Sequence, residues 1–178
     1  MAVFAVLMRL REICCDPRLV ADNWDGGSAK LDACMELVTA AVEGGHRILL
    51  FSQFTSMLEL LAKRLDEAGV SHFTLQGSTP KPVRAELVRR FNSGEADVFL
   101  ISLRAGGTGL NLTAADIVIH YDPWWNVAAQ NQATDRAYRI GQRNPVQVYK
   151  LIAQDTIEEK IVELQQAKQD LAETVTGS

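Results

Sequence analysis

The stretch DVFLISLRAGGTGLNL, residues 97–112, decides the fold class, because it joins a short apolar run to a glycine-rich loop. The run DVFLIS, residues 97–102, has the length and composition of a buried β-strand. The loop that follows carries three glycines close to Arg104. Glycines beside an arginine at the end of a strand favour a close approach of the backbone to an anion.

Strand and helix patterns alternate along the rest of the chain. Ser28 is a suitable N-cap for one helix, and Pro82 suits the first turn of another. Strands are predicted at residues 47–51, 72–76, 97–102, 116–121 and 146–153. Helices are predicted at residues 2–13, 29–42, 55–68, 81–91, 128–139 and 157–172. This alternation predicts one α/β domain of three layers, a parallel sheet with helices on both faces and flanking helices at each end.

The composition is that of an ordinary globular protein, with 178 residues, 47% hydrophobic and 22% charged. No apolar run has the length of a membrane span, and no signal-peptide pattern is present, so we expect an intracellular protein without a membrane partner. The cysteines Cys14, Cys15 and Cys34 are predicted to be reduced structural thiols, and no metal site is predicted. The net charge of −4 argues against general nucleic-acid binding but leaves room for a local basic groove.

Polar segments follow the predicted strands, where ligands bind in open parallel sheets. They are SQFTS (52–56), QGSTP (76–80), SLRAGGTGLN (102–111) and YDPWWN (121–126). The alternative is that these segments are only solvent-exposed loops.

Neither common nucleotide-binding glycine motif is complete. The chain contains no G-x-x-x-x-G-K-[ST] phosphate loop. Gly107 and Gly109 form G-x-G without the third glycine of a dinucleotide fingerprint, which disfavours a nicotinamide-dependent enzyme.

The segment QATDRAYRIGQ, residues 132–142, places Arg136 and Arg139 on one face of a predicted helix. Paired guanidinium groups favour bidentate binding of a polyphosphate. Because the chain lacks a phosphate loop, the pair could complete a nucleotide site formed by another lobe. The alternative is a buried structural pair bound to Asp135 and Asp116.

Five segments in order resemble motifs of the Swi/Snf family of helicase-like, DNA-stimulated ATPases. They are ILLFSQFTSML (48–58), LQGSTPKPVR (75–84), LISLRAGGTGLNLTAAD (100–116), HYDPWWN (120–126) and QATDRAYRIGQ (132–142). The resemblance extends from about Leu7 to near the C-terminus. It implies the second RecA-like lobe of a two-lobe motor, whose phosphate loop and acidic metal-binding box belong to the first lobe.

The resemblance also implies a domain organisation. Residues 1–27 would be a helix and linker from the inter-lobe region, residues 28–153 the helicase C-terminal lobe, and residues 154–178 a brace helix. Val127 stands where the family often has proline, and Cys15–Asp16 where it commonly has Asn-His. Both departures are predicted to be neutral for the mechanism.

By this resemblance, Arg136 and Arg139 are arginine fingers that reach the γ-phosphate of ATP, and Gln132 couples the nucleotide and DNA states. Gly107, Gly109 and Asn111 would lie beside the ribose and phosphates, with Mg²⁺ held by the first lobe. The implied DNA contacts are Ser52, Gln53, Gly77, Ser78, Thr79, Arg84, Ser102, Arg104 and Trp125. Such hydroxyl, backbone and arginine donors position a DNA backbone without reading its sequence. Core packing is predicted for at least one of Trp124 and Trp125.

The expected function is that of an ATP-dependent translocase on double-stranded DNA, in which the isolated lobe is inactive. Its expected partners are duplex DNA, the first lobe of the same parent chain and a DNA-bound protein substrate. The alternative function is a non-catalytic protein- or DNA-binding module with the same fold.

Overall fold

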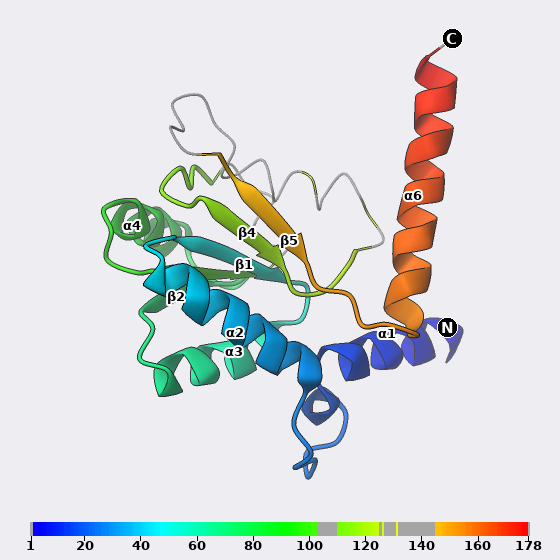
Figure 1. Ribbon diagram of the computed structural model, residues 1–178, viewed down its shortest axis with the longest axis horizontal. Helices are drawn as coiled ribbons and strands as arrows, with labels where there is room; N and C mark the ends of the chain where they lie inside the picture. The colour runs from blue at the N-terminus through cyan, green and yellow to red at the C-terminus, as the bar shows by residue number, and fades with distance from the viewer. Residues whose placement is uncertain (1, 103–109, 125, 127–130, 132–144, 178) are drawn as a thin grey trace.

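The computed structural model describes residues 2–102, 110–124, 126, 131 and 145–177 (Figure 1). Its elements, in chain order, are α1 (Ala2–Cys15), η1 (Pro17–Leu19), α2 (Ala29–Glu43), β1 (Ile48–Ser52), α3 (Thr55–Glu67), β2 (His72–Leu75), α4 (Lys81–Asn92), β3 (Val98–Ser102), β4 (Ile117–His120), β5 (Gln147–Lys150) and α6 (Ile157–Thr176). The helix predicted at residues 128–139 lies outside the described residues.

The five strands form one parallel sheet in the order β2-β3-β1-β4-β5. Every residue of β1, β3 and β4 is buried, because each of these strands has neighbours on both sides and layers on both faces. The register aligns Ser52 at the end of β1 with Ser102 at the end of β3. The carboxyl ends of the two strands therefore open at the same edge of the sheet.

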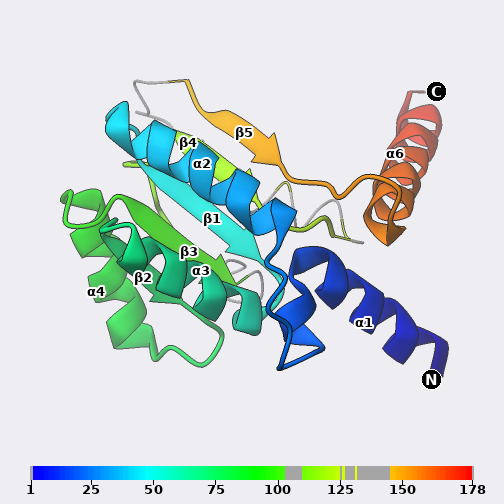
Figure 2. The same ribbon diagram turned by 60° about the horizontal axis from the view of Figure 1, so that its bottom comes forward.

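Alternate side chains of the central strands supply the two halves of the core. Ile48 and Leu50 pack into the cluster that includes residues of α2 and α3, whereas Leu49 and Phe51 pack with Phe91 of α4. Figure 2 shows α2 and α3 side by side over one face of the sheet. The predicted three-layer α/β fold is confirmed.

Local signals fix where the helices begin. Ser28 caps α2, because its Oγ accepts a hydrogen bond from Leu31 N at 3.3 Å. Thr156 caps α6 in the same way by accepting from Glu158 N at 3.2 Å. The predicted roles of Ser28 and of Pro82, in the first turn of α4, are confirmed.

The flanking helices α1 and α6 meet beyond the ends of the strands (Figure 1). Arg11 of α1 donates a hydrogen bond from Nη2 to the carbonyl oxygen of Pro123 at 3.2 Å. The first half of α6 packs on the domain, whereas residues 166–177 are exposed. No helix in the described part of the chain combines the length and apolar character needed to cross a membrane.

Candidate functional site

A groove of about 590 Å³, here called the strand-end groove, opens beyond the carboxyl ends of β1 and β3. Four residues predicted to contact DNA lie in it together, namely Gln53, Gly77, Ser78 and Ser102. The remaining lining residues are Glu12, Phe54, Thr55, Ser56 and Gln76. The sheet register thus brings together segments 52–56 and 76–78 with Ser102, as expected for strands whose ends coincide.

Two side-chain atoms of this groove are buried without a hydrogen-bond partner among the described residues. They are Nε2 of Gln53 and Oγ of Ser102. Unpaired buried donors cost free energy, so such atoms mark a place where a ligand oxygen would be favourable.

The N-terminus of α3 faces the same groove through Thr55 and Ser56. Its N-cap residue Phe54 makes no side-chain capping hydrogen bond, and the first turn contains no acidic residue. Free N–H groups and the helix dipole favour an anion at such a position. The groove therefore combines two unpaired side-chain atoms with an uncapped helix start, which suits an oxyanion.

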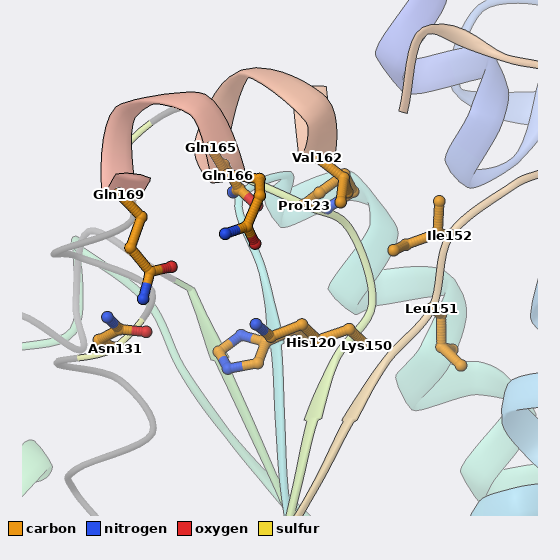
Figure 3. Close-up of a pocket in the computed structure, with 10 residues that line it drawn as sticks. All are labelled: His120, Pro123, Asn131, Lys150, Leu151, Ile152, Val162, Gln165, Gln166 and Gln169. Atoms are coloured by element: carbon orange, nitrogen blue, oxygen red, sulfur yellow. The ribbon is translucent and has the colours of Figure 1, made fainter. Parts of the chain in front are cut away.

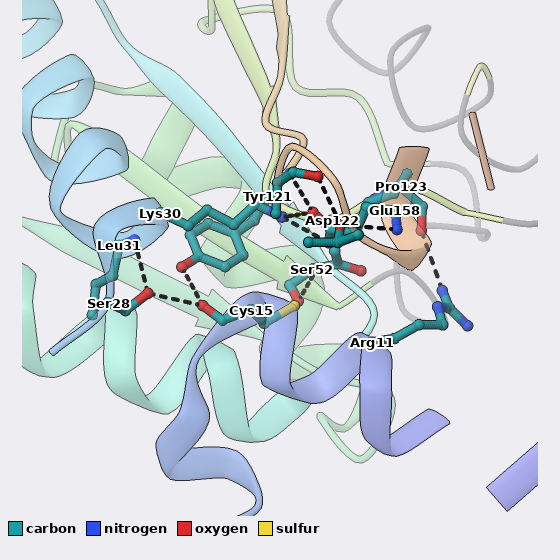
Figure 4. A network of polar contacts seen from close by, with 12 residues as sticks. Arg11, Cys15, Ser28, Lys30, Leu31, Ser52, Tyr121, Asp122, Pro123 and Glu158 are labelled. Atoms are coloured by element: carbon teal, nitrogen blue, oxygen red, sulfur yellow. Dashed lines mark hydrogen bonds and ion pairs between the residues drawn. The ribbon is translucent and has the colours of Figure 1, made fainter. Parts of the chain in front are cut away.

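Ser52 is differently placed from Ser102, although the two are register partners. Ser52 is fully buried, and its Oγ donates a hydrogen bond to Oδ1 of Asp122 (Figure 4). Oδ2 of Asp122 accepts from Gln53 N at 3.2 Å, and Ser52 Oγ accepts from Phe54 N at 3.1 Å. Burial raises the pKa of Asp122 to about 6. The Asp122 carboxylate, which the sequence analysis did not single out, therefore organises the turn between β1 and α3.

Arg84 organises the opposite wall of the strand-end groove. Its guanidinium donates to the carbonyl oxygens of Thr79 at 2.7 Å, Gly77 at 2.8 Å and Gln76 at 3.3 Å. The hydroxyl of Thr79 accepts from Gln76 N at 3.0 Å. Arg84 and Thr79 thus hold the loop in shape by internal hydrogen bonds.

A second groove, of about 830 Å³, lies on the α4 side of this loop. It contains Thr79, Lys81, Arg84 and the exposed residue Asn111. The carbonyl oxygen of Asn111 accepts from Asn92 Nδ2 at 2.8 Å. Asn111 therefore lies next to Thr79 and Arg84, which are predicted to contact DNA. That Asn111 lies beside a nucleotide stays a prediction.

The remaining candidate residues, namely Gly107, Gly109, Arg104, Trp125, Gln132, Arg136 and Arg139, lie outside the described residues. Asp116, the proposed structural partner of the arginines, accepts from Arg47 N at 3.0 Å and pairs with His46 Nδ1 at 2.7 Å. Trp124 is buried in the core cluster on the α4 face, as predicted for at least one of the two tryptophans.

A smaller cavity of about 250 Å³ separates the ends of β4 and β5 from α6 (Figure 3). Gln166 and Gln169 reach down from α6 toward His120 and Asn131. Burial, together with the charge of Lys150, lowers the pKa of His120 to about 4, so its imidazole is neutral at physiological pH. The two glutamine amides also donate to acidic residues of α6 itself, Gln166 to Asp170 at 2.8 Å.

Cys15 and Asp16, which depart from the family pattern, have structural contacts, whereas Val127 lies outside the described residues. The carbonyl oxygen of Cys15 accepts from Tyr121 Oη at 2.8 Å, and the buried Asp16 carboxylate accepts from Arg18 Nη2 at 2.7 Å.

Burial raises the pKa of the Cys34 thiol to about 12, so Cys34 stays protonated in the core. Within the described residues, no three His, Cys, Asp or Glu side chains converge as a metal site.

Comparison with known protein families and sequences gives consistent matches. Residues 29–141 match the family described as the helicase conserved C-terminal domain. An uncharacterised ATP-dependent helicase of Mycoplasma pneumoniae is 41% identical over 173 residues, which are 95% of this chain and 16% of the relative. The mouse SWI/SNF-related matrix-associated actin-dependent regulator of chromatin subfamily A member 1 is 39% identical over 181 residues, with 94% and 17% coverage. The chain thus spans about a sixth of the length of these relatives.

Two solved structures share the fold. The SWI2/SNF2 ATPase core of Sulfolobus solfataricus, in complex with double-stranded DNA, has a TM-score of 0.81 and 35% identity over 95% of this chain and 36% of its own. The C-terminal part of the Fun30 ATPase domain has a TM-score of 0.75 and 33% identity over 88% of this chain and 53% of its own.

Proposed function

The chain belongs to the helicase conserved C-terminal domain family, among its Swi/Snf-like members, and we propose on that basis that it is the second motor lobe of an ATP-dependent translocase on double-stranded DNA. The family resemblance drawn from the sequence motifs and the RecA-like fold are both confirmed by these matches. An intracellular location follows from a function on DNA.

The strand-end groove is the observation that carries this proposal. Gln53, Ser102 and the first residues of α3 line it together, and their amide, hydroxyl and backbone N–H groups suit a phosphate oxygen. Contacts of this kind hold a DNA backbone regardless of sequence, which is what a translocase requires at each step. The neighbour of known structure that contains duplex DNA supports the same assignment.

Apart from Asn111, the residues of the nucleotide half of the proposal lie outside the described part of the chain. We assign Arg136 and Arg139 as fingers that reach the γ-phosphate of ATP bound on the first lobe, with Gln132 coupling that site to DNA. Gly107, Gly109 and Asn111 would lie near the ribose and phosphates. We assign Mg²⁺ to the first lobe, as the family resemblance implies.

The domain boundaries are part of this proposal. Residues 1–27 connect the lobes, residues 28–153 form the motor lobe, and residues 154–178 form the brace helix. A DNA-bound protein would be the substrate that the motor displaces.

DNA binding by the chain itself tests the groove. We expect fluorescence anisotropy to show binding to a short labelled duplex that weakens steeply with added salt, because phosphate contacts release counterions. Gln53→Ala and Ser102→Ala should each weaken binding similarly for unrelated DNA sequences. Binding that is absent at low salt, or unaffected by both substitutions, would contradict the proposed interface.

ATP hydrolysis tests the assignment of the fingers. The chain alone should show no multiple-turnover hydrolysis with DNA. In a longer parent protein that contains both lobes, Arg136→Ala and Arg139→Ala should each lower DNA-stimulated hydrolysis by roughly a thousand-fold or more. Equal rates in the wild type and both variants would favour the alternative, a non-catalytic binding module with a RecA-like fold.

A further inference from the structure

We propose that Asp122 is a positioning residue, whose carboxylate holds the turn between β1 and α3 in the shape that presents Gln53 and the start of α3 to a DNA phosphate. The proposal rests on the DNA-binding function proposed above and adds to it a residue that does not itself touch DNA.

Asp122 accepts hydrogen bonds from two residues of the turn and is connected to a third through Ser52. Oδ1 accepts from Ser52 Oγ, and Oδ2 accepts from Gln53 N at 3.2 Å. Ser52 Oγ in turn accepts from Phe54 N at 3.1 Å, which extends the connection to the N-cap of α3. One carboxylate thus fixes the backbone on both sides of the Gln53 side chain that lines the strand-end groove.

The contact is long-range and deeply buried. Asp122 is 2% exposed and lies 70 positions from Ser52 in the sequence. It follows β4, whereas the turn follows β1, and these two strands are paired in the sheet. Asp122 therefore holds the turn from the β4 side of β1. Ser102, at the end of β3, lies on the other side of β1.

A negative charge on the buried Asp122 side chain costs free energy. We therefore infer that the carboxylate does something that a neutral side chain would not do. Among the described side chains, Asp122 takes part in no ion pair, and a buried carboxylate without such a pair costs free energy. Both of its oxygens accept hydrogen bonds. An amide would offer only one acceptor oxygen and would direct an NH₂ group at a donor.

The surroundings of Asp122 are defined by three helices. Arg11 and Cys15 belong to α1, Lys30 to α2, and Glu158 to α6 (Figure 4). The Lys30 charge favours the ionised carboxyl, whereas burial and Glu158 oppose it. Since burial raises the pKa of Asp122 to about 6, the carboxylate gains a proton in a pH range that duplex DNA tolerates.

Asp116 provides a matched control within the same sheet. Its carboxylate, like that of Asp122, accepts a hydrogen bond from the backbone next to β1. The donor is Arg47 N, at 3.0 Å. Asp116 precedes β4 and Arg47 precedes β1, so this contact lies at the opposite edge of the sheet from the groove.

The experiment compares duplex affinities of the whole chain by fluorescence anisotropy at fixed low salt. Asp122→Asn and Ser52→Ala are each expected to weaken affinity by about tenfold, and Asp116→Asn by less than about twofold. Combining Asp122→Asn with Gln53→Ala should weaken binding by less than the product of the two single effects, because the aspartate acts in part through Gln53.

A pH series separates positioning from general destabilisation. Wild-type affinity should fall as the pH is lowered from about 7.5 to about 5, since a protonated Asp122 cannot accept both hydrogen bonds. The Asp122→Asn variant should lack this dependence, whereas Asp116→Asn should keep it.

Each outcome bears on one of the two proposals. If Gln53→Ala weakens binding and Asp122→Asn does not, the positioning role is wrong and the groove assignment stands. If the wild-type chain and Gln53→Ala bind DNA equally poorly, the DNA-binding function itself is wrong. Should Asp122→Asn fail to fold, Ser52→Ala carries the test, and wild-type affinity in that variant would overturn the positioning role.

Discussion

The ammonium of Lys30 in α2 lies 2.7 Å from the carboxylate of Glu158 in α6, although 128 positions separate them in the sequence. Both side chains are largely buried, at 8% and 1% exposure. Glu158 also accepts a hydrogen bond from Ala153 N at 2.8 Å, and Lys30 lies 5.0 Å from the ring centroid of Tyr121. This pair is one of the polar contacts that hold the start of α6 on the domain.

Removing one partner of this pair should be strongly destabilising. Lys30→Met leaves the buried Glu158 charge without its cation, and we expect the free energy of unfolding to fall by about 3–5 kcal/mol. Urea denaturation followed by circular dichroism measures the change. Lys160→Met, which breaks the exposed pair with Glu163 on the same helix, should change stability by less than about 1 kcal/mol. Similar losses in the two variants would contradict the role given to the buried pair.

Arg84 is expected to act on DNA affinity through the loop at residues 76–79. Arg84→Ala removes the donors to three loop carbonyls, and duplex affinity should fall by about tenfold. Arg84→Lys should not restore it, because one ammonium lacks the planar fork that reaches several acceptors. If Arg84 binds phosphate directly instead, Arg84→Lys should keep most of the affinity. Arg89→Ala, which breaks an exposed pair with Glu86 on the same helix, serves as the control.

Among the described residues that line the strand-end groove, Glu12 is the one carboxylate. Its charge opposes a phosphate, so Glu12→Gln should tighten duplex binding by about threefold to fivefold at low salt. The gain should shrink as salt is added, because screening weakens the repulsion. Glu36→Gln removes an exposed charge on α2 outside the groove and should have a smaller effect. Equal effects of the two substitutions would argue against a phosphate in this groove.

Asp122 should make the stability of the domain depend on pH. Its pKa is raised from 3.8 to about 6 by burial, so between these values the folded state keeps a proton that the unfolded state releases. The free energy of unfolding should therefore fall by up to about 3 kcal/mol as the pH rises from about 4 to about 6, with no further change from this group above that range. Urea denaturation midpoints are measured for the wild type and Asp122→Asn across this pH range. The difference between the two curves gives the contribution of Asp122 to the pH dependence of stability. Parallel curves for the two proteins would contradict the raised pKa.

The fold could be predicted because its central strands are buried on both faces. Such strands appear in the sequence as short apolar runs, and the predicted runs at 47–51 and 97–102 differ by one residue or less at each end from β1 and β3. The strand predicted at 146–153 was too long. Among the described strands it pairs only with the four-residue β4, and pairing ends where His120 meets Lys150, so residues 151–153 leave the sheet.

The candidate site was predicted only in part, because residue type does not reveal which donors already have a partner. Ser52 and Ser102 have the same sequence context at the end of a buried strand, yet only Ser52 meets Asp122. Arg84 was predicted to contact DNA, which stays a prediction, and the sequence did not reveal that its guanidinium donates to the loop that follows β2. These differences depend on contacts between distant segments, which no local pattern records.

The anchoring of α6 has a mechanical consequence. The buried residues Glu158, Ile161 and Gln165 hold its first half, and residues 166–177 extend from the body of the domain (Figure 1). A helix of 20 residues is about 30 Å long, so a tilt of about 10° at its base displaces its tip by about 5 Å. The Lys30–Glu158 pair lies at the base of this helix, so a given tilt there displaces Thr176 far more than it displaces the residues beside the sheet.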